Sequence, residues 1–399
     1  MRSRSTPRAD LLGSPRDGTA PGVQTSVYVH FPWCLKKCPY CDFASGAVRH
    51  DDVPHAAYAD AVIAELTSRP MADRELVSVF FGGGTPSLWA PAQLGRVLCA
   101  VRGAFRAEAP GLEVTVECNP TSIDEDHVRA LADVGVNRIS IGVQSLDDGR
   151  LGFLGRLHDA EGALTALRGA TAAMPRVSAD LMFGMPDQLP RDFVEELERV
   201  LDTGVEHVSA YALTVEPGTQ FGALRRLGRL PLASDDDYAD TFLAAEAAFS
   251  ARGFLHYEVS NYAPAGKESR HNQHYWRGGD YLGLGAGAVG ALSDGVTAVR
   301  RKNDPRPERY LDNPTGGTVY EETLNPADRV REALMLGLRT TEGVDLAGLA
   351  SRTGRDPREG RERELVAALA RGDLSEDAGR LTVPRSRWLR LDSIVTAIF

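Results

Sequence analysis

Cysteine is scarce in this sequence, which has only five cysteines among 399 residues. An odd number in a chain of this length argues against the disulfide scaffold of small secreted proteins. Long apolar runs are also missing: no stretch of about 18 apolar residues exists, so no segment is predicted to cross a membrane. Basic charge is not in excess, because 55 acidic residues outnumber 45 basic ones and give a net charge of −10. We therefore expect no nucleic-acid partner.

The N-terminal residues 1–22 lack the apolar segment of a signal peptide. They are rich in small and basic residues, and we predict that they form a disordered lead-in. A hydrophobic content of 43% lets the rest of the chain bury a proper core. These features predict a protein of the reducing cytoplasm.

Short β-branched runs alternate with helical patterns from residue 27 onward. The predicted strands are 27–31, 76–81, 112–117, 138–143, 176–183 and 207–214. The predicted helices are 54–68, 91–107, 123–134, 160–173, 190–203 and 235–252. Six strand–helix units in series predict an α/β fold with a parallel sheet, either open or closed into a barrel. Thr121 or Ser122 is predicted to cap the helix near 123, and Gly135 to follow its end.

Each predicted strand ends in a short polar or glycine-rich segment. The carboxyl ends of parallel strands meet at one edge of the sheet, where α/β folds bind ligands. The pattern predicts one shared site formed by the segments 34–41, 82–86, 117–120, 144–145, 184–186 and 216–219.

The pattern changes after about residue 255. Residues 256–262 predict one more strand. Helices are predicted at 326–338, 345–353 and 358–371, followed by a short hairpin and a last helix. This order is typical of a winged-helix-like domain. We expect its basic residues to serve packing or docking rather than DNA binding; they are Arg385, Arg387 and Arg390.

Three of the five cysteines, Cys34, Cys38 and Cys41, fall within eight residues of one another. Thiolates at this spacing can converge on one metal centre. A structural zinc site, completed by His30 or His50, is one reading, although such sites usually contain two separated cysteine pairs. An iron–sulfur cluster is the other. A [4Fe–4S] cluster held by three cysteines would leave one iron open to a further ligand.

The C-x3-C-x2-C spacing after the first strand resembles the radical S-adenosylmethionine (SAM) enzymes. Further motifs resemble the oxygen-independent coproporphyrinogen oxidase group; they are 28–34, 38–43, 82–86, 117–120, 140–145, 180–186, 216–219 and 333–339. The resemblance implies an incomplete parallel (β/α)6 barrel over 23–260, a glycine-rich connecting region over 261–320 and a C-terminal helical, winged-helix-like domain over 321–399. It also implies a [4Fe–4S] cluster on the three cysteines, with SAM beside it.

Two members of this group differ at one position. The coproporphyrinogen III dehydrogenases, which act in porphyrin biosynthesis, carry a fourth cysteine two places after the third, where this chain has Phe43. The HemW-type haem chaperones have an aromatic residue there and an H-N-x-x-Y-W motif, which matches His271–Trp276. The chain therefore resembles the haem chaperones, with the dehydrogenase as the alternative. The resemblance implies haem as ligand and haem-requiring clients, membrane-bound respiratory enzymes among them, at the inner face of the membrane.

The resemblance also implies roles for single residues. Backbone groups of the glycine-rich segment and one carboxylate would bind the SAM amino group; they are Gly83, Gly84, Thr85 and Glu117. Arg156 would bind the SAM carboxylate as a planar fork. The ribose hydroxyls would pair with Gln144 and Asp180. Aromatic residues near the cluster or SAM would be Tyr28 and Tyr40.

The haem ligand implied by the motif is His271, flanked by Tyr275 and Trp276, whereas His274 is the weaker candidate. The stretch Gly285–Gly290 matches G-x-G-x-x-G, but it does not connect a strand to a helix and so predicts no dinucleotide site. Members of the group often have histidine within this stretch where the chain has Val289. The haem contacts are therefore expected to differ from theirs.

Overall fold

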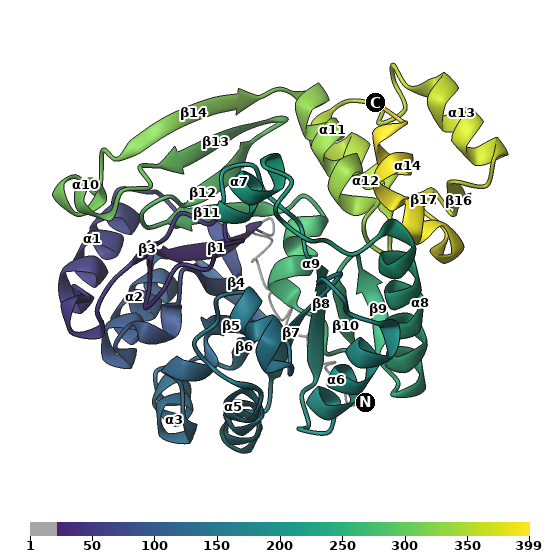
Figure 1. Cartoon of the computed structure of the whole chain (residues 1–399). Coiled ribbons are helices and arrows are strands. Elements are labelled where there is room, and N and C mark those ends of the chain that lie inside the picture. Colours follow the sequence, from purple (N-terminus) through teal and green to yellow (C-terminus); the bar gives the residue numbers. More distant parts are fainter. Residues whose placement is uncertain (1–21) are drawn as a thin grey trace, which may run out of the picture.

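The computed structural model describes residues 22–399, and six parallel strands form its centre. In sheet order they are β1 (Val23–Phe31), β4 (Arg74–Gly83), β5 (Ala107–Cys118), β6 (Arg138–Gln144), β7 (Val177–Phe183) and β8 (His207–Ala212). The helices that follow them cover the outside (Figure 1): α1 (His55–Thr67), α2 (Pro91–Ala104), α3 (Glu125–Asp133), α5 (Ala160–Ala173), α6 (Pro190–Leu201) and α8 (Asp235–Ala251). The predicted α/β barrel is confirmed. The predicted disordered segment 1–22 lies, apart from Gly22, outside the described residues.

Strand β1 shows why these segments form a sheet that is buried on both faces. Successive side chains of a strand point to opposite faces. One face of β1 contributes apolar residues to the core between strands and helices; they are Val27, Val29 and Phe31. The other face carries Tyr28 and His30, which line a cavity. Apolar packing thus fixes the register and leaves polar side chains for the barrel interior.

The start of α3 differs from the prediction. Its N-cap is Asp124, whose carboxylate accepts the His127 backbone N–H at 2.8 Å. Thr121 and Ser122 instead belong to a separate 3-10 turn, Pro120–Ser122. The negative charge of Asp124 lies at the positive, N-terminal end of the helix dipole, where it stabilises the helix. The prediction that Gly135 follows the helix end is confirmed, and its φ of +101° is one that glycine adopts without strain.

The central sheet extends well beyond the barrel. On the β1 side, β11 (Asp280–Leu284) pairs in parallel with β1, and three antiparallel strands follow: β12 (Val289–Asp294), β13 (Thr297–Asn303) and β14 (Thr318–Leu324). The expected connecting region 261–320 therefore contributes several strands to the sheet. At the other edge, the strand expected at 256–262 is a hairpin of β9 (Leu255–Glu258) and β10 (Asn261–Ala263).

The C-terminal part has an apolar core of its own. It contains α11 (Pro326–Gly337), α12 (Leu346–Thr353), α13 (Glu362–Ala370), α14 (Leu391–Thr396) and a small sheet of β15 (Val344–Asp345), β16 (Ser375–Asp377) and β17 (Arg380–Thr382). Arg385 pairs with Glu246 of α8 and lies over the Trp388 ring, so it packs this part onto the barrel.

The described chain also contains shorter elements: β2 (Trp33–Cys34), β3 (Gly46–Ala47), α4 (Asp148–Phe153), α7 (Gln220–Arg226), α9 (Arg270–Trp276) and α10 (Pro307–Asp312). Of these, α9 contacts β4, β11 and α11, and so lies where the barrel meets the C-terminal part (Figure 1). Among residues 22–399, no helix is long and apolar enough to cross a membrane.

Candidate functional site

A cavity of about 300 Å³ opens at the carboxyl ends of the barrel strands. We call it the strand-end cavity. It brings together all but one of the residues predicted to hold the cluster and SAM: Cys34, Cys38, Tyr40, Cys41, Gly83, Gly84, Thr85, Glu117, Gln144, Arg156 and Asp180. The exception is Tyr28, which lines a different cavity. Lining residues that sequence reasoning did not assign include Lys36, Lys37, Ser140, Met182 and Tyr211.

The three cysteines lie on the loop after β1, and local hydrogen bonds hold that loop. Lys37 Nζ donates to the carbonyl oxygens of Phe43 and Ser45 at 2.9 and 3.0 Å. All three thiols are free and half-buried, and burial raises the pKa values of Cys34 and Cys41. In the described chain no three His, Cys, Asp or Glu side chains surround a position for one metal ion. A [4Fe–4S] cluster does not need the three side chains to surround a single position, because each thiolate binds a different iron.

The glycine-rich segment after β4 runs against the cysteine loop at very short range. A Cβ on Gly84 would lie 2.4 Å from the Trp33 carbonyl oxygen, so only glycine fits. The backbone N–H groups of the segment are all occupied: Gly83 donates to Glu117 Oε2, Gly84 to the Phe31 carbonyl and Thr85 to the Trp33 carbonyl. Their carbonyl groups are therefore the backbone candidates for binding an ammonium group.

Two half-buried carboxyl groups, Glu117 and Asp180, line the strand-end cavity together with this segment. Burial and the nearby Asp180 raise the pKa of Glu117 to about 7. The pKa of Asp180 is also raised by burial, although Ser140 Oγ donates to its carboxylate at 3.1 Å. A cation placed between these groups would stabilise both carboxylates, because it would offset their mutual repulsion.

Arg156 brings positive charge to the wall of the strand-end cavity. Its Nη2 donates to the Gly142 carbonyl at 2.7 Å, and its Nη1 lies 3.6 Å from Cys38 Sγ. Its Nε is buried with no partner in the described residues. A buried N–H without a partner costs free energy, so this guanidinium is suited to an anionic ligand.

A second, larger cavity of about 680 Å³ lies beside the first, and we call it the side cavity. Phe43, whose side chain is 57% exposed, lines both cavities. The other lining residues come from β1, the cysteine loop, α9, the added strands and α11: Tyr28, His30, Asp42, Ala44, His271, Tyr275, Tyr281, Gly287, Val289, Arg300, Lys302, Glu332, Met335 and Leu336.

The side cavity contains two of the three residues predicted to bind haem, His271 and Tyr275. Trp276 does not line it and packs against Tyr275 with ring centroids 6.0 Å apart. His274 bonds the Asp280 carbonyl at 2.8 Å and stays outside. Helical geometry explains the split, because residues one apart face different directions while residues four apart share a face. Val289 also lines the cavity.

His271 is held as a neutral imidazole. Burial lowers its pKa to about 3. Nδ1 shares a 2.9 Å hydrogen bond with Ser78 Oγ, and the ring lies 4.9 Å from that of Phe80. Nε2 has no hydrogen-bond partner in residues 22–399. When Nδ1 carries the proton and donates it to Ser78, Nε2 is the nitrogen that is free to bind a metal.

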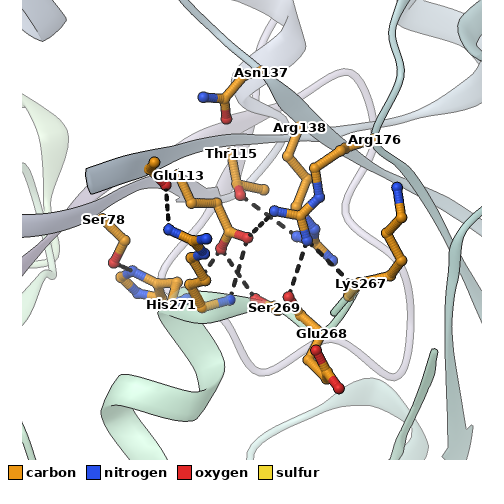
Figure 2. A network of polar contacts seen from close by, with 12 residues as sticks. Ser78, Glu113, Thr115, Asn137, Arg138, Arg176, Lys267, Glu268, Ser269 and His271 are labelled. Atoms are coloured by element: carbon orange, nitrogen blue, oxygen red, sulfur yellow. Dashed lines mark hydrogen bonds and ion pairs between the residues drawn. The ribbon is translucent and has the colours of Figure 1, made fainter. Parts of the chain in front are cut away.

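A buried ion network fixes the start of α9, as Figure 2 shows. Glu113 accepts the backbone N–H groups of Arg270 and His271 at 3.2 and 3.0 Å. It also pairs with Arg176 at 2.8 Å. Burial alone would raise the pKa of Glu113, but Arg138, Arg176 and these N–H donors lower it. Sequence reasoning missed this network; the only signal was charged residues inside or beside otherwise apolar strands.

Two family models match the chain: "Radical SAM superfamily" over residues 28–200 and "HemN C-terminal domain" over residues 324–389. The mitochondrial radical S-adenosyl methionine domain-containing protein 1 of Mus musculus is 38% identical over 348 residues, 85% of this chain and 78% of the relative. The heme chaperone HemW of Escherichia coli is 34% identical over 380 residues, 93% and 97% of the two chains. This chain belongs to the HemW family of radical SAM proteins.

Among solved structures, the radical SAM enzyme coproporphyrinogen III oxidase (HemN) of Escherichia coli has a TM-score of 0.78 at 23% identity. The match covers 95% of this chain and 90% of that one. At this identity the likeness establishes the fold. The HemW family chain described here shares the barrel and the C-terminal part with that enzyme, and the resemblance stated from the motifs is confirmed.

Proposed function

We propose that this protein is a haem chaperone, which binds a [4Fe–4S] cluster and SAM in the strand-end cavity and haem in the side cavity. The observation that carries the haem site is His271, a neutral imidazole with a free Nε2 on the wall of a large, partly aromatic cavity. Neutral imidazole is a common axial ligand of haem iron. The names of the HemW relatives support this reading.

The strand-end cavity fits a [4Fe–4S] cluster and SAM. When bound, such a cluster leaves one iron open to SAM and supplies one-electron chemistry. Cys34, Cys38 and Cys41 would be its ligands. All three thiols are half-buried on the cavity wall, and Arg156 Nη1 lies 3.6 Å from Cys38 Sγ.

The same cavity offers complementary groups for both ends of SAM. Glu117 and the carbonyls of the glycine-rich segment would bind the methionyl ammonium, and Arg156 would bind the carboxylate with its unpaired Nε. Gln144 and Asp180 would bind the ribose hydroxyls, and Tyr40 would close the cavity near the cluster. Tyr28 lies on the side-cavity wall, so it would contact haem rather than SAM.

The client and the location stay predictions. We propose transfer to haem-requiring proteins, with membrane-bound respiratory enzymes among them, at the inner face of the membrane. The open mouth of the side cavity suits transfer, because a chaperone has to release its ligand. We also propose the domain limits 23–260 for the barrel, 261–320 for the motif-bearing region and 321–399 for the C-terminal domain.

The test is anaerobic reconstitution followed by haem titration. The wild type is expected to bind haem with a shifted Soret band, and His271→Ala to lose that shift. His50→Ala is the matched control, because His50 is exposed and lines neither cavity. Equal haem spectra for wild type and His271→Ala would overturn the proposed ligand.

Metal analysis and a turnover assay on the same sample address the alternatives. A content of about four irons per chain, with sulfide, would support the cluster. One zinc per chain and no iron would instead support a structural zinc site. Decarboxylation of coproporphyrinogen III, with 5′-deoxyadenosine as co-product, would favour the dehydrogenase. We expect none, because Phe43 stands where the dehydrogenases have their fourth cysteine.

A further inference from the structure

The floor of the side cavity is the extended sheet, and its strand register places the lining residues in rows. One row contains Tyr28, Gly283, Val289 and Lys302, on β1, β11, β12 and β13. The next row contains Tyr281, Ala291 and Arg300. Gly283 has no room for a Cβ, which would lie 2.2 Å from the Val289 carbonyl oxygen. The strands therefore approach closely and form a continuous floor from the barrel to β13.

Two cationic side chains lie at the β13 side of this floor. Arg300 and Lys302 are two residues apart on β13, so both side chains leave the same face of the strand, about 6–7 Å apart. Both line the side cavity, whereas Arg301 between them points away and pairs with Glu321 at 2.7 Å. Of the three consecutive basic residues on β13, the first and the third therefore face the cavity and the middle one does not.

The two cations differ in how they are paired. Arg300 donates to Glu332 at 2.5 Å and to Glu322 at 3.3 Å. Lys302 is exposed and has no side-chain partner in residues 22–399. The other acid on the cavity wall, Asp42, comes from the cysteine loop. Lys302 is thus the positive charge on the wall that no internal acid neutralises.

We propose that Lys302, assisted by Arg300, binds the propionate carboxylates of haem and selects for a porphyrin that carries them. This proposal rests on the haem site proposed above. Haem is an apolar disc whose two propionates leave one edge. His271, Phe43 and Tyr275 suit the disc and its iron, and the β13 cations suit the charged edge.

The arrangement also gives the ligand one orientation. Asp42 would repel a propionate placed toward the cysteine loop, so the carboxylates would turn toward β13. The hydrogen bond from Arg300 to Glu332 restrains the arginine side chain before haem binds. A guanidinium has five donors, so Arg300 can retain Glu332 and still donate to a propionate.

An ordinary solvated lysine on a strand is the competing explanation, and Arg301 provides the control for it. We propose titration of the full-length protein with haem and with haem dimethyl ester, in which both propionates are blocked. The variants are Lys302→Met, which keeps the apolar stem of the side chain, and Arg301→Met on the opposite face of the same strand.

Lys302→Met is expected to weaken haem binding about three- to tenfold at low salt, and Arg301→Met to leave it unchanged. The ester is expected to bind the wild type more weakly than haem does, and to be insensitive to Lys302→Met. Added salt should weaken haem binding to the wild type more than to Lys302→Met.

Equal affinities of the wild type for haem and its ester would overturn the propionate proposal, as would equal effects of the two variants. Failure of the haem site itself has a different signature, in which His271→Ala leaves the haem spectrum unchanged. Metal-free protoporphyrin separates the two further, because it lacks iron but keeps both propionates. Its binding should depend on Lys302 and not on the imidazole ligand.

Discussion

The carboxylate of Glu113 is expected to be the anchor of α9, and Glu113→Gln tests this. The side chain of Glu113 is fully buried, and its charge faces Arg176 at 2.8 Å with Arg138 nearby. Breaking a buried ion pair by removing one partner typically costs about 3–5 kcal/mol. Glutamine keeps one oxygen acceptor, so we expect a loss of about 2–4 kcal/mol in the free energy of unfolding.

The assay is urea unfolding followed by circular dichroism, with haem titration of the same samples. The matched control is Glu161→Gln, which removes one partner of an exposed ion pair with Arg168 and should change stability by less than about 1 kcal/mol. Haem binding should weaken as well, since Glu113 fixes the backbone of His271. A loss no larger than that of the control would refute the anchoring role.

The pH dependence of the same variant gives an independent check. Because the pKa of Glu113 is lowered in the folded protein, its carboxylate stabilises the fold above the unfolded-state pKa of about 4.3. That contribution is lost as the pH falls from there through the folded-state pKa. The stability gap between wild type and Glu113→Gln should therefore be constant near neutral pH and close in acid.

Three further outcomes are expected at the strand-end cavity. Replacing any one of the three loop cysteines with alanine should lower iron and sulfide content after reconstitution, whereas Cys99→Ala should leave both unchanged. Gly84→Ala should abolish SAM binding by equilibrium dialysis and lower the melting temperature, because its Cβ would meet a carbonyl oxygen; Gly103→Ala in α2, where nothing lies within 4 Å, should be neutral or stabilising. SAM should bind up to about tenfold more tightly at pH 8 than at pH 6, as Glu117 ionises with its pKa near 7, and Glu117→Gln should remove this dependence.

The elements of the barrel could be predicted because local patterns decide them. β-branched runs and amphipathic segments located all six barrel strands and the helices between them to within a few residues. The strand-end cavity followed from topology, since every parallel strand delivers its carboxyl end to the same edge. The cysteine spacing is likewise a local feature, which the sequence displays directly.

Other features depended on contacts between distant segments. Ser78 and His271 are 193 positions apart, and no local pattern pairs them. The region after residue 261 was expected as a connection, because its short strands are recognisable only when β11 adds to the edge of β1. Tyr28 was assigned to the SAM site because strand periodicity shows only which face of the strand a residue lies on. Two cavities adjoin that face, and the sequence does not show which of them Tyr28 lines.

The sequence by itself determined the repeated strand–helix units, the cysteine triad and the aromatic residue at position 43. These are set by hydrophobic periodicity and by covalent spacing, which act over a few residues. Only the tertiary structure decided that α9 closes against the barrel and that β13 brings Arg300 and Lys302 to the cavity of His271. Those placements come from burial of whole surfaces and from the Glu113 ion network, whose partners are far apart in the chain and meet only in the folded protein.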